Sequence, residues 1–184
     1  LPGLSVLSAL EPAGGDLWRP LEPRIRQAEL AYCANHAHDV CNWMTMPNES
    51  GHPSFCFACR FNRTIPNLEK PENLERWRKL EAAKHRLFYT ILRLNLPIKT
   101  RQEDPHGGLM FDFLEDPEDG SAPVMTGHDN GIITIALREA DDASREQMRV
   151  EMGEHYRTLL GHFRHEVGHY YWNVLVRDGG RLEA

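Results

Sequence analysis

The sequence predicts an α+β fold in which a four-cysteine module accompanies helices and a small sheet. All four cysteines fall within residues 31–66, among short, turn-rich pieces. Beyond them, apolar residues recur at helical spacing, and two short apolar runs bounded by Gly, Pro and Asp lie between the helical patterns. Strands placed between helices in this order are typical of a small α+β domain.

Composition and charge exclude several classes of protein. The chain has 184 residues, of which 41% are hydrophobic and 26% charged, so it can bury a core. Its net charge of −6 argues against nucleic-acid binding over the whole surface. No apolar run is long enough to span a membrane, and no basic region precedes an apolar run as it would in a signal peptide, so we expect a cytoplasmic protein without a membrane partner. Because it begins with Leu1, we expect a fragment or a processed chain.

The charge is unevenly distributed. Residues 60–101 carry 11 basic and 4 acidic side chains, a net charge of +7 that could face an acidic partner. The simpler interpretation is a solvated helix face, since Glu72 and Arg76, and Glu75 and Lys79, are spaced as i,i+4 pairs.

The elements are expected in the following order. Residues 1–30 hold many prolines and glycines, which predicts a loop-rich arm before the cysteines. Apolar residues at spacings of 3 and 4 predict a helix over 72–95, which Pro97 closes. Strands are expected near 107–116 and over 131–137, with His128 on a short strand or loop between them.

Two helices complete the chain. Ser144 and Gln147 form a capping box that would open the first of them. The second is expected over 154–176, before the stop signal of Gly179 and Gly180. We therefore divide the chain into an arm with the cysteine module, residues 1–66, and an α+β core, residues 67–184.

The cysteines have the spacing expected of a zinc site. Cys33, Cys41, Cys56 and Cys59 follow the pattern C-x7-C-x14-C-x2-C, and four thiolates suit tetrahedral zinc. The alternatives to a zinc site are two disulfides, a redox-active C-x2-C pair, or four buried free thiols. A site with four protein ligands leaves no open position, so this zinc would be structural.

The last helix carries a second metal-binding pattern, H-E-x-x-H. His165 and His169 are one helical turn apart, so both imidazoles can bind one zinc. Glu166 would lie beside the metal and act as general base toward water. The alternatives are a chance match and an ordinary polar helix face.

Helical geometry places the two sides of this helix apart. At ~100° per residue, one arc is apolar and the opposite side carries His162, His165, Glu166 and His169. The apolar arc predicts the buried face and consists of Tyr156, Leu159, Leu160, Phe163, Val167, Tyr170, Tyr171 and Val174.

A catalytic zinc needs a third protein ligand, which the motif does not supply. The carboxylates that follow the helix, Asp178 and Glu183, would hardly reach back to the metal. The third ligand would therefore come from upstream, with His128 as the first candidate, from a segment outside this sequence, or not at all.

The sequence resembles a zinc-binding metallopeptidase family of bacteria that carries a zinc-ribbon region ahead of an H-E-x-x-H helix. The likeness covers nearly the whole chain, although members of the family look longer at both ends. It implies zinc at the four cysteines, zinc at His165 and His169, and Glu166 as general base. The segments that carry it are CNWM (41–44), CFACRFNRTIPNL (56–68), WRKLEAAKHRL (77–87), GLMFDFL (108–114), MTGHDNGIITI (125–135), EADD (139–142) and YRTLLGHFRHEVGHYYW (156–172).

We therefore expect a zinc-ribbon-like cysteine module packed on a zincin-like core that hydrolyses peptide or protein substrates. Residues 131–137 would offer a sheet edge to an extended peptide. The alternative is a non-catalytic zinc-binding module that binds a protein or other acidic partner. The candidates to stabilise the oxyanion are His128, Tyr156, Arg157 and Arg164, each of which could also be an ordinary packed or surface side chain.

Overall fold

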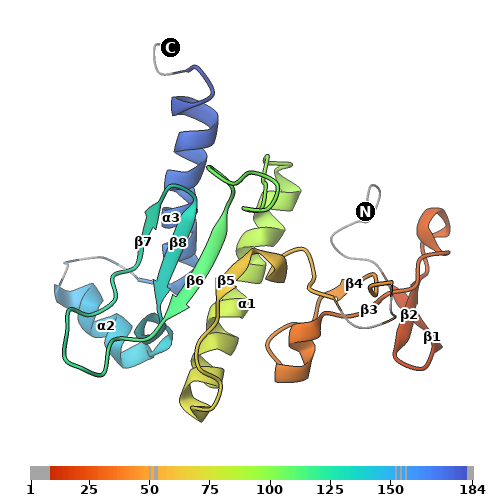
Figure 1. Ribbon diagram of the computed structural model, residues 1–184, viewed down its shortest axis with the longest axis horizontal. Coiled ribbons are helices and arrows are strands. Elements are labelled where there is room, and N and C mark those ends of the chain that lie inside the picture. Colours follow the sequence, from red (N-terminus) through yellow and green to blue (C-terminus); the bar gives the residue numbers. More distant parts are fainter. Residues whose placement is uncertain are drawn as a thin grey trace. The chain divides into compact units, whose positions relative to one another are not determined.

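The computed structural model describes residues 9–49, 51, 54–151, 153, 155 and 157–181, and it divides the chain into two units (Figure 1). The first unit comprises Leu1–Arg60 and Phe88–Leu96, and the second comprises Phe61–Leu87 and Pro97–Ala184. Helix α1 (Pro71–Arg93) contributes residues to both units. The boundary expected after residue 66 stays a prediction.

The first unit begins with a β-hairpin. Strands β1 (Leu10–Gly14) and β2 (Leu17–Pro20) pair antiparallel; Gly14 ends β1 and Gly15 begins the turn, with φ angles of 106° and 56°. Glycine adopts these positive angles without steric cost. The expectation of a loop-rich arm is wrong for these strands, because the prolines that suggested loops are compatible with a two-stranded hairpin.

A second, shorter hairpin carries the first two cysteines. Strands β3 (Ala31–Tyr32) and β4 (Met44–Thr45) pair antiparallel, and a 3-10 helix (Ala34–His38) lies between them. The Cys33 N–H donates to the carbonyl oxygen of Trp43 over 2.9 Å, which extends the pairing toward the cysteines. A further 3-10 helix (Cys59–Phe61) begins at the last of the four cysteines.

The second unit contains a four-stranded sheet in the order β5-β6-β8-β7, formed by β5 (Asn62–Thr64), β6 (Met110–Leu114), β8 (Ile132–Ala136) and β7 (Gly127–Asp129). The contacts of β6 with β5 and β8 are parallel, whereas β7 pairs antiparallel with β8. The expectation that residues 131–137 form a sheet edge is wrong, since β8 is paired on both sides.

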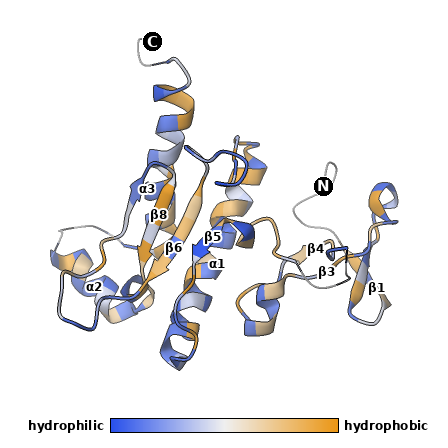
Figure 2. Cartoon of the chain, viewed as in Figure 1, coloured by the Kyte–Doolittle hydropathy of each residue, from blue (hydrophilic) through white to orange (hydrophobic). Residues whose placement is uncertain are grey.

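Two helices pack on the same face of strand β6. The rings of Phe111 and Phe113 lie 5.8 and 6.4 Å from the ring of Phe163 on α3 (Leu159–Trp172). The ammonium group of Lys84 on α1 lies 5.7 and 5.5 Å from the same two rings. Strands β6 and β8 are predominantly hydrophobic (Figure 2), which is consistent with their burial between neighbours.

A buried polar network holds α1 to strand β5. The side chains of Glu81 and Lys84 are fully buried, and the Lys84 ammonium donates to a Glu81 carboxylate oxygen over 2.8 Å. The same oxygen accepts hydrogen bonds from the Asn62 amide at 2.8 Å and from the Trp77 indole at 3.2 Å. Since every member has a partner, the network offsets the cost of burying two charges.

The remaining helices differ slightly from expectation. Helix α2 (Asp142–Glu151) begins before Ser144, which therefore lies inside the helix and is not its cap. A 3-10 helix (Leu137–Ala140) precedes α2, and α3 continues into a π-helix (Asn173–Arg177). None of the helices among the described residues combines the length and apolar character that crossing a membrane requires.

Several basic side chains of the middle segment form ion pairs within the second unit. Arg63 forms a two-point ion pair with Asp112, which is 2% exposed. The side chain of Arg76 forms a second such pair with Asp141, at 3.0 and 2.9 Å. Acidic side chains of the same unit therefore neutralise part of this positive charge, and no acidic binding partner is needed to explain that part.

Candidate functional site

The four cysteines form one buried cluster in the first unit. None is in a disulfide, and their four sulfur atoms all lie within 4.8 Å of one another. Cys41 Sγ and Cys56 Sγ are 3.6 Å apart. Zinc–sulfur bonds of about 2.3 Å in a tetrahedron place sulfurs about 3.8 Å apart, so the cluster fits a zinc ion and the predicted cysteine module is confirmed.

Backbone amides and the other thiols surround these sulfurs. The Cys56 N–H donates to Cys33 Sγ over 3.3 Å, and the Trp43 N–H donates to Cys41 Sγ over 3.4 Å. Hydrogen bonds from the other three thiols lower the pKa of Cys33, whereas the hydrogen bonds in which Cys41 takes part raise its pKa. The backbone N–H donors to Cys33 and Cys41, unlike the hydrogen bonds among the thiols, favour the thiolate at both sulfurs, and the thiolate is the form that binds metal.

Helix α3, in the second unit, is fixed at its start and along one face. The Thr158 hydroxyl accepts the Gly161 N–H over 3.0 Å, as an N-cap side chain does. Phe163, Val167 and Tyr170 are buried, as the helical pattern predicted, while Leu159 and Leu160 are half-buried. The opposite face is therefore left to polar residues.

The two histidines of the H-E-x-x-H pattern meet on the exposed side of α3. His165 Nε2 and His169 Nε2 are 3.1 Å apart, and their rings are nearly perpendicular, with 4.8 Å between the centroids. Zinc–nitrogen bonds of about 2.0–2.1 Å in a tetrahedron place two nitrogens about 3.3 Å apart. The pair is therefore spaced to bind one zinc, and Glu166 is half-buried beside it.

His128 lies near this pair, and one of its ring nitrogens is engaged by the backbone. Its ring is nearly parallel to that of His169, with 6.4 Å between centroids. Its Nε2 atom accepts the Gly131 N–H over 2.9 Å. Among the described residues, no third His, Cys, Asp or Glu ligand atom lies within 4.8 Å of both ring nitrogens of the pair.

The other candidates separate into different positions. Tyr156 lies outside the described residues. Arg164 is exposed, whereas Arg157 donates to a carboxylate oxygen of Glu139 over 3.0 Å, with side chains only 8% and 3% exposed. Asp178 forms a two-point ion pair with Arg177, and it does not form a ligand cluster with His165 and His169 among the described residues.

Glu139 anchors the first turns of α3, a role that sequence reasoning missed. Besides Arg157, its carboxylate lies 3.1 Å from His162 Nδ1. Burial raises the pKa of Glu139, but His162 and Arg157 outweigh it, so the pKa falls below its usual value. His162 was expected on the polar face with His165; it is instead only 16% exposed because it pairs with this carboxylate.

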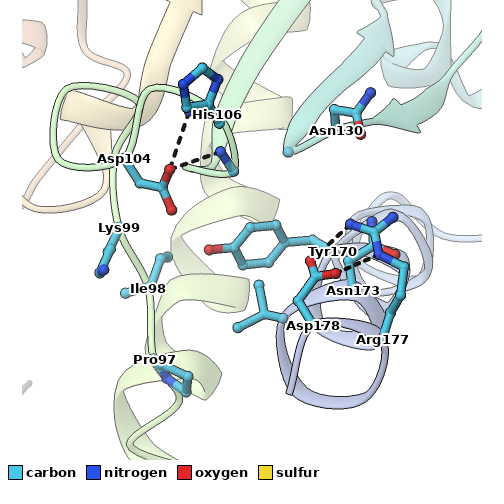
Figure 3. Close-up of a pocket in the computed structure, with 13 residues that line it drawn as sticks. Pro97, Ile98, Lys99, Asp104, His106, Asn130, Tyr170, Asn173, Arg177 and Asp178 are labelled. Carbon is cyan, nitrogen blue, oxygen red and sulfur yellow. Dashed lines mark hydrogen bonds and ion pairs between the residues drawn. The ribbon is translucent and has the colours of Figure 1, made fainter. Parts of the chain in front are cut away.

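A pocket of about 230 Å³ lies beyond His169 in the same unit. Its walls are the loop 97–107, the turn between β7 and β8, and the end of α3 (Figure 3). The ring of Tyr170 lies across the pocket between the loop and the helix end. Sequence reasoning did not find this pocket.

Comparisons with known proteins agree with both regions. Residues 73–184 match the family model described as "Putative zinc-binding metallo-peptidase", and residues 1–70 match that of a zinc-ribbon domain. Uncharacterized proteins of Mycobacterium bovis and Mycobacterium tuberculosis are 43% identical over 149 residues, which is 81% of this chain. The chain spans only 42% of the length of these relatives. No solved structure matches it.

The first of these matches covers more than half of the chain. It includes the whole of α3 and the histidine pair on it. The zinc-ribbon match covers all four clustered cysteines. The chain thus belongs to this zinc-binding metallo-peptidase family through residues 73–184, which follow a zinc-ribbon domain in residues 1–70.

Proposed function

We propose that the protein hydrolyses peptide bonds with a zinc ion bound by His165 and His169, and that the cysteine cluster binds a second, structural zinc. The observation that carries the proposal is the separation of 3.1 Å between the two Nε2 atoms on an exposed helix face. Both rings are reachable from solvent, whereas the cysteines are buried. An open site and a closed site suit a catalytic and a structural zinc, respectively.

Each residue of the pattern has a distinct task. Zinc, when bound, supplies a Lewis acid that acidifies water and polarises a peptide carbonyl. The Glu166 carboxylate takes the proton from the attacking water and later delivers it to the leaving amine. The buried face of α3 and the Glu139 anchor hold the histidines and Glu166 in place.

His128 fits the role of oxyanion stabiliser better than that of third ligand. A neutral imidazole has one donor and one acceptor nitrogen. Because His128 Nε2 accepts the Gly131 N–H, its Nδ1 carries the proton and can donate to a developing negative charge. We propose that the third zinc ligand comes from outside the described residues.

Zinc content and peptide cleavage test this function together. We expect two zinc ions per chain in the wild type and one each in Cys56→Ala and His165→Ala, measured by elemental analysis. Glu166→Gln should keep both ions and lower kcat on a peptide mixture by about 10²–10⁴-fold, the usual worth of a general base. His155→Ala, which alters another exposed histidine, is the control and should change neither quantity.

Two results would contradict the proposal. A single zinc that survives His165→Ala would leave a zinc-binding module without a catalytic metal. Undiminished cleavage by Glu166→Gln would remove Glu166 from the mechanism.

A further inference from the structure

We infer that the pocket beside His169 binds one bulky, uncharged side chain of the peptide substrate, with an aromatic side chain as the best fit. This inference rests on the proposed function, since it assigns a specificity to the same site. It concerns a pocket that neither the motif nor the family match describes.

The pocket adjoins the histidine pair through the helix and through the β7–β8 turn. Tyr170 directly follows His169, and the Asn173 N–H donates to the His169 carbonyl oxygen. On the other wall, Gly131 binds His128 through its N–H. A peptide held at the histidines can therefore extend a neighbouring side chain into the pocket.

The walls have a fixed and unusual backbone. Asn173 and Val174 belong to the π-helical segment, a rare conformation that is frequent at functional sites. Gly131 has a φ of +87°, and a Cβ atom there would lie 2.5 Å from the Gly108 carbonyl oxygen. No larger side chain fits that position, so the turn forms a close-fitting wall.

The interior suits a flat or branched apolar group. Ile98 and the ring of Tyr170 supply apolar surface to the pocket (Figure 3), and Val174 also lines it. A volume of about 230 Å³ is below that of most pockets for whole small ligands, so it accommodates a single side chain. Tyr170 is only 4% exposed, so its ring forms part of the pocket wall, and a flat aromatic group can pack against that apolar wall.

The charges around the pocket balance one another. The Asp104 carboxylate accepts the N–H groups of His106 and Gly107, at 3.2 and 2.9 Å, and the charge of Lys99 acts on it. Arg177 and Asp178 neutralise each other at the opposite rim. Among the described lining residues neither sign is in excess, so a single charged side chain would lack a dedicated partner and an uncharged one is favoured.

A binding measurement tests the pocket without catalysis. N-acetyl-L-tyrosinamide is titrated into the isotope-labelled chain, and the NMR resonances of Asn130, Gly131 and Asn173 are followed. We expect saturable shifts at these residues, and affinity at least tenfold weaker for the lysine and glutamate analogues. Equal or tighter binding of a charged analogue, or no shifts with any of them, would overturn the inference.

A matched pair of variants tests the role in cleavage. Val174→Trp fills the pocket, whereas Leu175→Trp adds the same group at an exposed neighbouring residue that does not line it. In a position-varied peptide library, the wild type and Leu175→Trp should prefer an aromatic residue at one fixed position by about tenfold or more. Val174→Trp should lose that preference.

The two proposals can fail separately. If no peptide is cleaved but N-acetyl-L-tyrosinamide binds at the pocket, the peptidase function fails and the pocket remains a site for aromatic side chains. If peptides are cleaved with the same preference by Val174→Trp and wild type, the specificity assignment is wrong and the peptidase function stands.

Discussion

The cysteine cluster and the histidine pair are both spaced for zinc, yet they are built in opposite ways. The cysteine side chains are almost completely buried, and their four sulfurs lie together within one small volume. His165 and His169 are exposed and supply only two nitrogens. The first arrangement completes the coordination of a metal, and the second leaves positions for other groups.

This difference indicates which interactions stabilise each region. The hairpin of β3 and β4 is too short to bury a large core, so we expect the cysteine module to depend on a bound metal for its stability. Helix α3 has a hydrophobic face, an N-cap and the Glu139 anchor, so it does not need a metal to form. Removing ligands should therefore have very different structural consequences in the two regions.

The largest effect is expected at the cysteine cluster. Cys56→Ala removes a ligand from a site whose metal supplies about 10–16 kcal/mol of folding free energy in small zinc modules. We expect the first unit to lose zinc and cooperative unfolding, which zinc analysis and NMR of the Trp43 amide would measure. His36→Ala is the control, because the His36 ring hydrogen-bonds with the carbonyl oxygen of Cys41 and not with its sulfur. Retention of zinc by Cys56→Ala would contradict the assignment of Cys56 as a zinc ligand and of the cysteine cluster as a closed site.

An intermediate effect is expected at the anchor of α3. Glu139→Gln leaves Arg157 buried without its charged partner, which should lower the free energy of unfolding by about 3–5 kcal/mol. Glu118→Gln is the control, since Glu118 pairs with Lys70 on the surface with 83% of its side chain exposed, and should cost at most about 1 kcal/mol. Urea unfolding of both variants measures the difference.

The same anchor predicts a dependence on pH. The pKa of Glu139 is lowered in the folded state, so its stabilising contribution is present above the ordinary glutamate pKa of about 4.3 and is lost as pH falls through the lower folded value. The wild type should therefore lose its stability advantage over Glu139→Gln in acid. An advantage that stays constant down to low pH would contradict the assignment of the ion pair.

The smallest effect on stability is expected at the histidine pair. His165→Ala changes an exposed side chain on a helix that is held by its other face, so the free energy of unfolding should change by no more than about 0.5 kcal/mol in zinc-free protein. Thermal unfolding in the presence of a chelator measures this. A large loss of stability would mean that the pair is part of the structure of α3 rather than an open site.

The parts of the molecule that the sequence predicted are those encoded by local patterns. The C-x2-C pair, the i,i+4 histidines and the buried stripe of α3 each depend on neighbours within a few turns. The order of strands in the sheet depends on contacts between distant segments, which is why β8 was wrongly expected at a sheet edge. Glu139, Arg157 and His162 come together through the tertiary fold, so no spacing in the sequence indicated their contact.

The pocket was missed for a related reason. Its walls come from three segments that are distant in the sequence, and the π-helical end of α3 follows no hydrophobic period that distinguishes it from an α-helix. The one local signal was the Asn130–Gly131 pair between two apolar runs, which is typical of a tight turn between strands.

The pairing of the central sheet has a consequence for how the chain acquires its structure. On strand β6, Phe111 lies opposite Asn62 on one side and Ile133 on the other. The first partner is far more distant along the chain, so its loop closure carries the larger entropic cost. During refolding, β6 and β8 should associate before β5 joins them, and until then one flank of β6 stays open to association with other chains. Dilute conditions should therefore favour recovery of the native protein over aggregation.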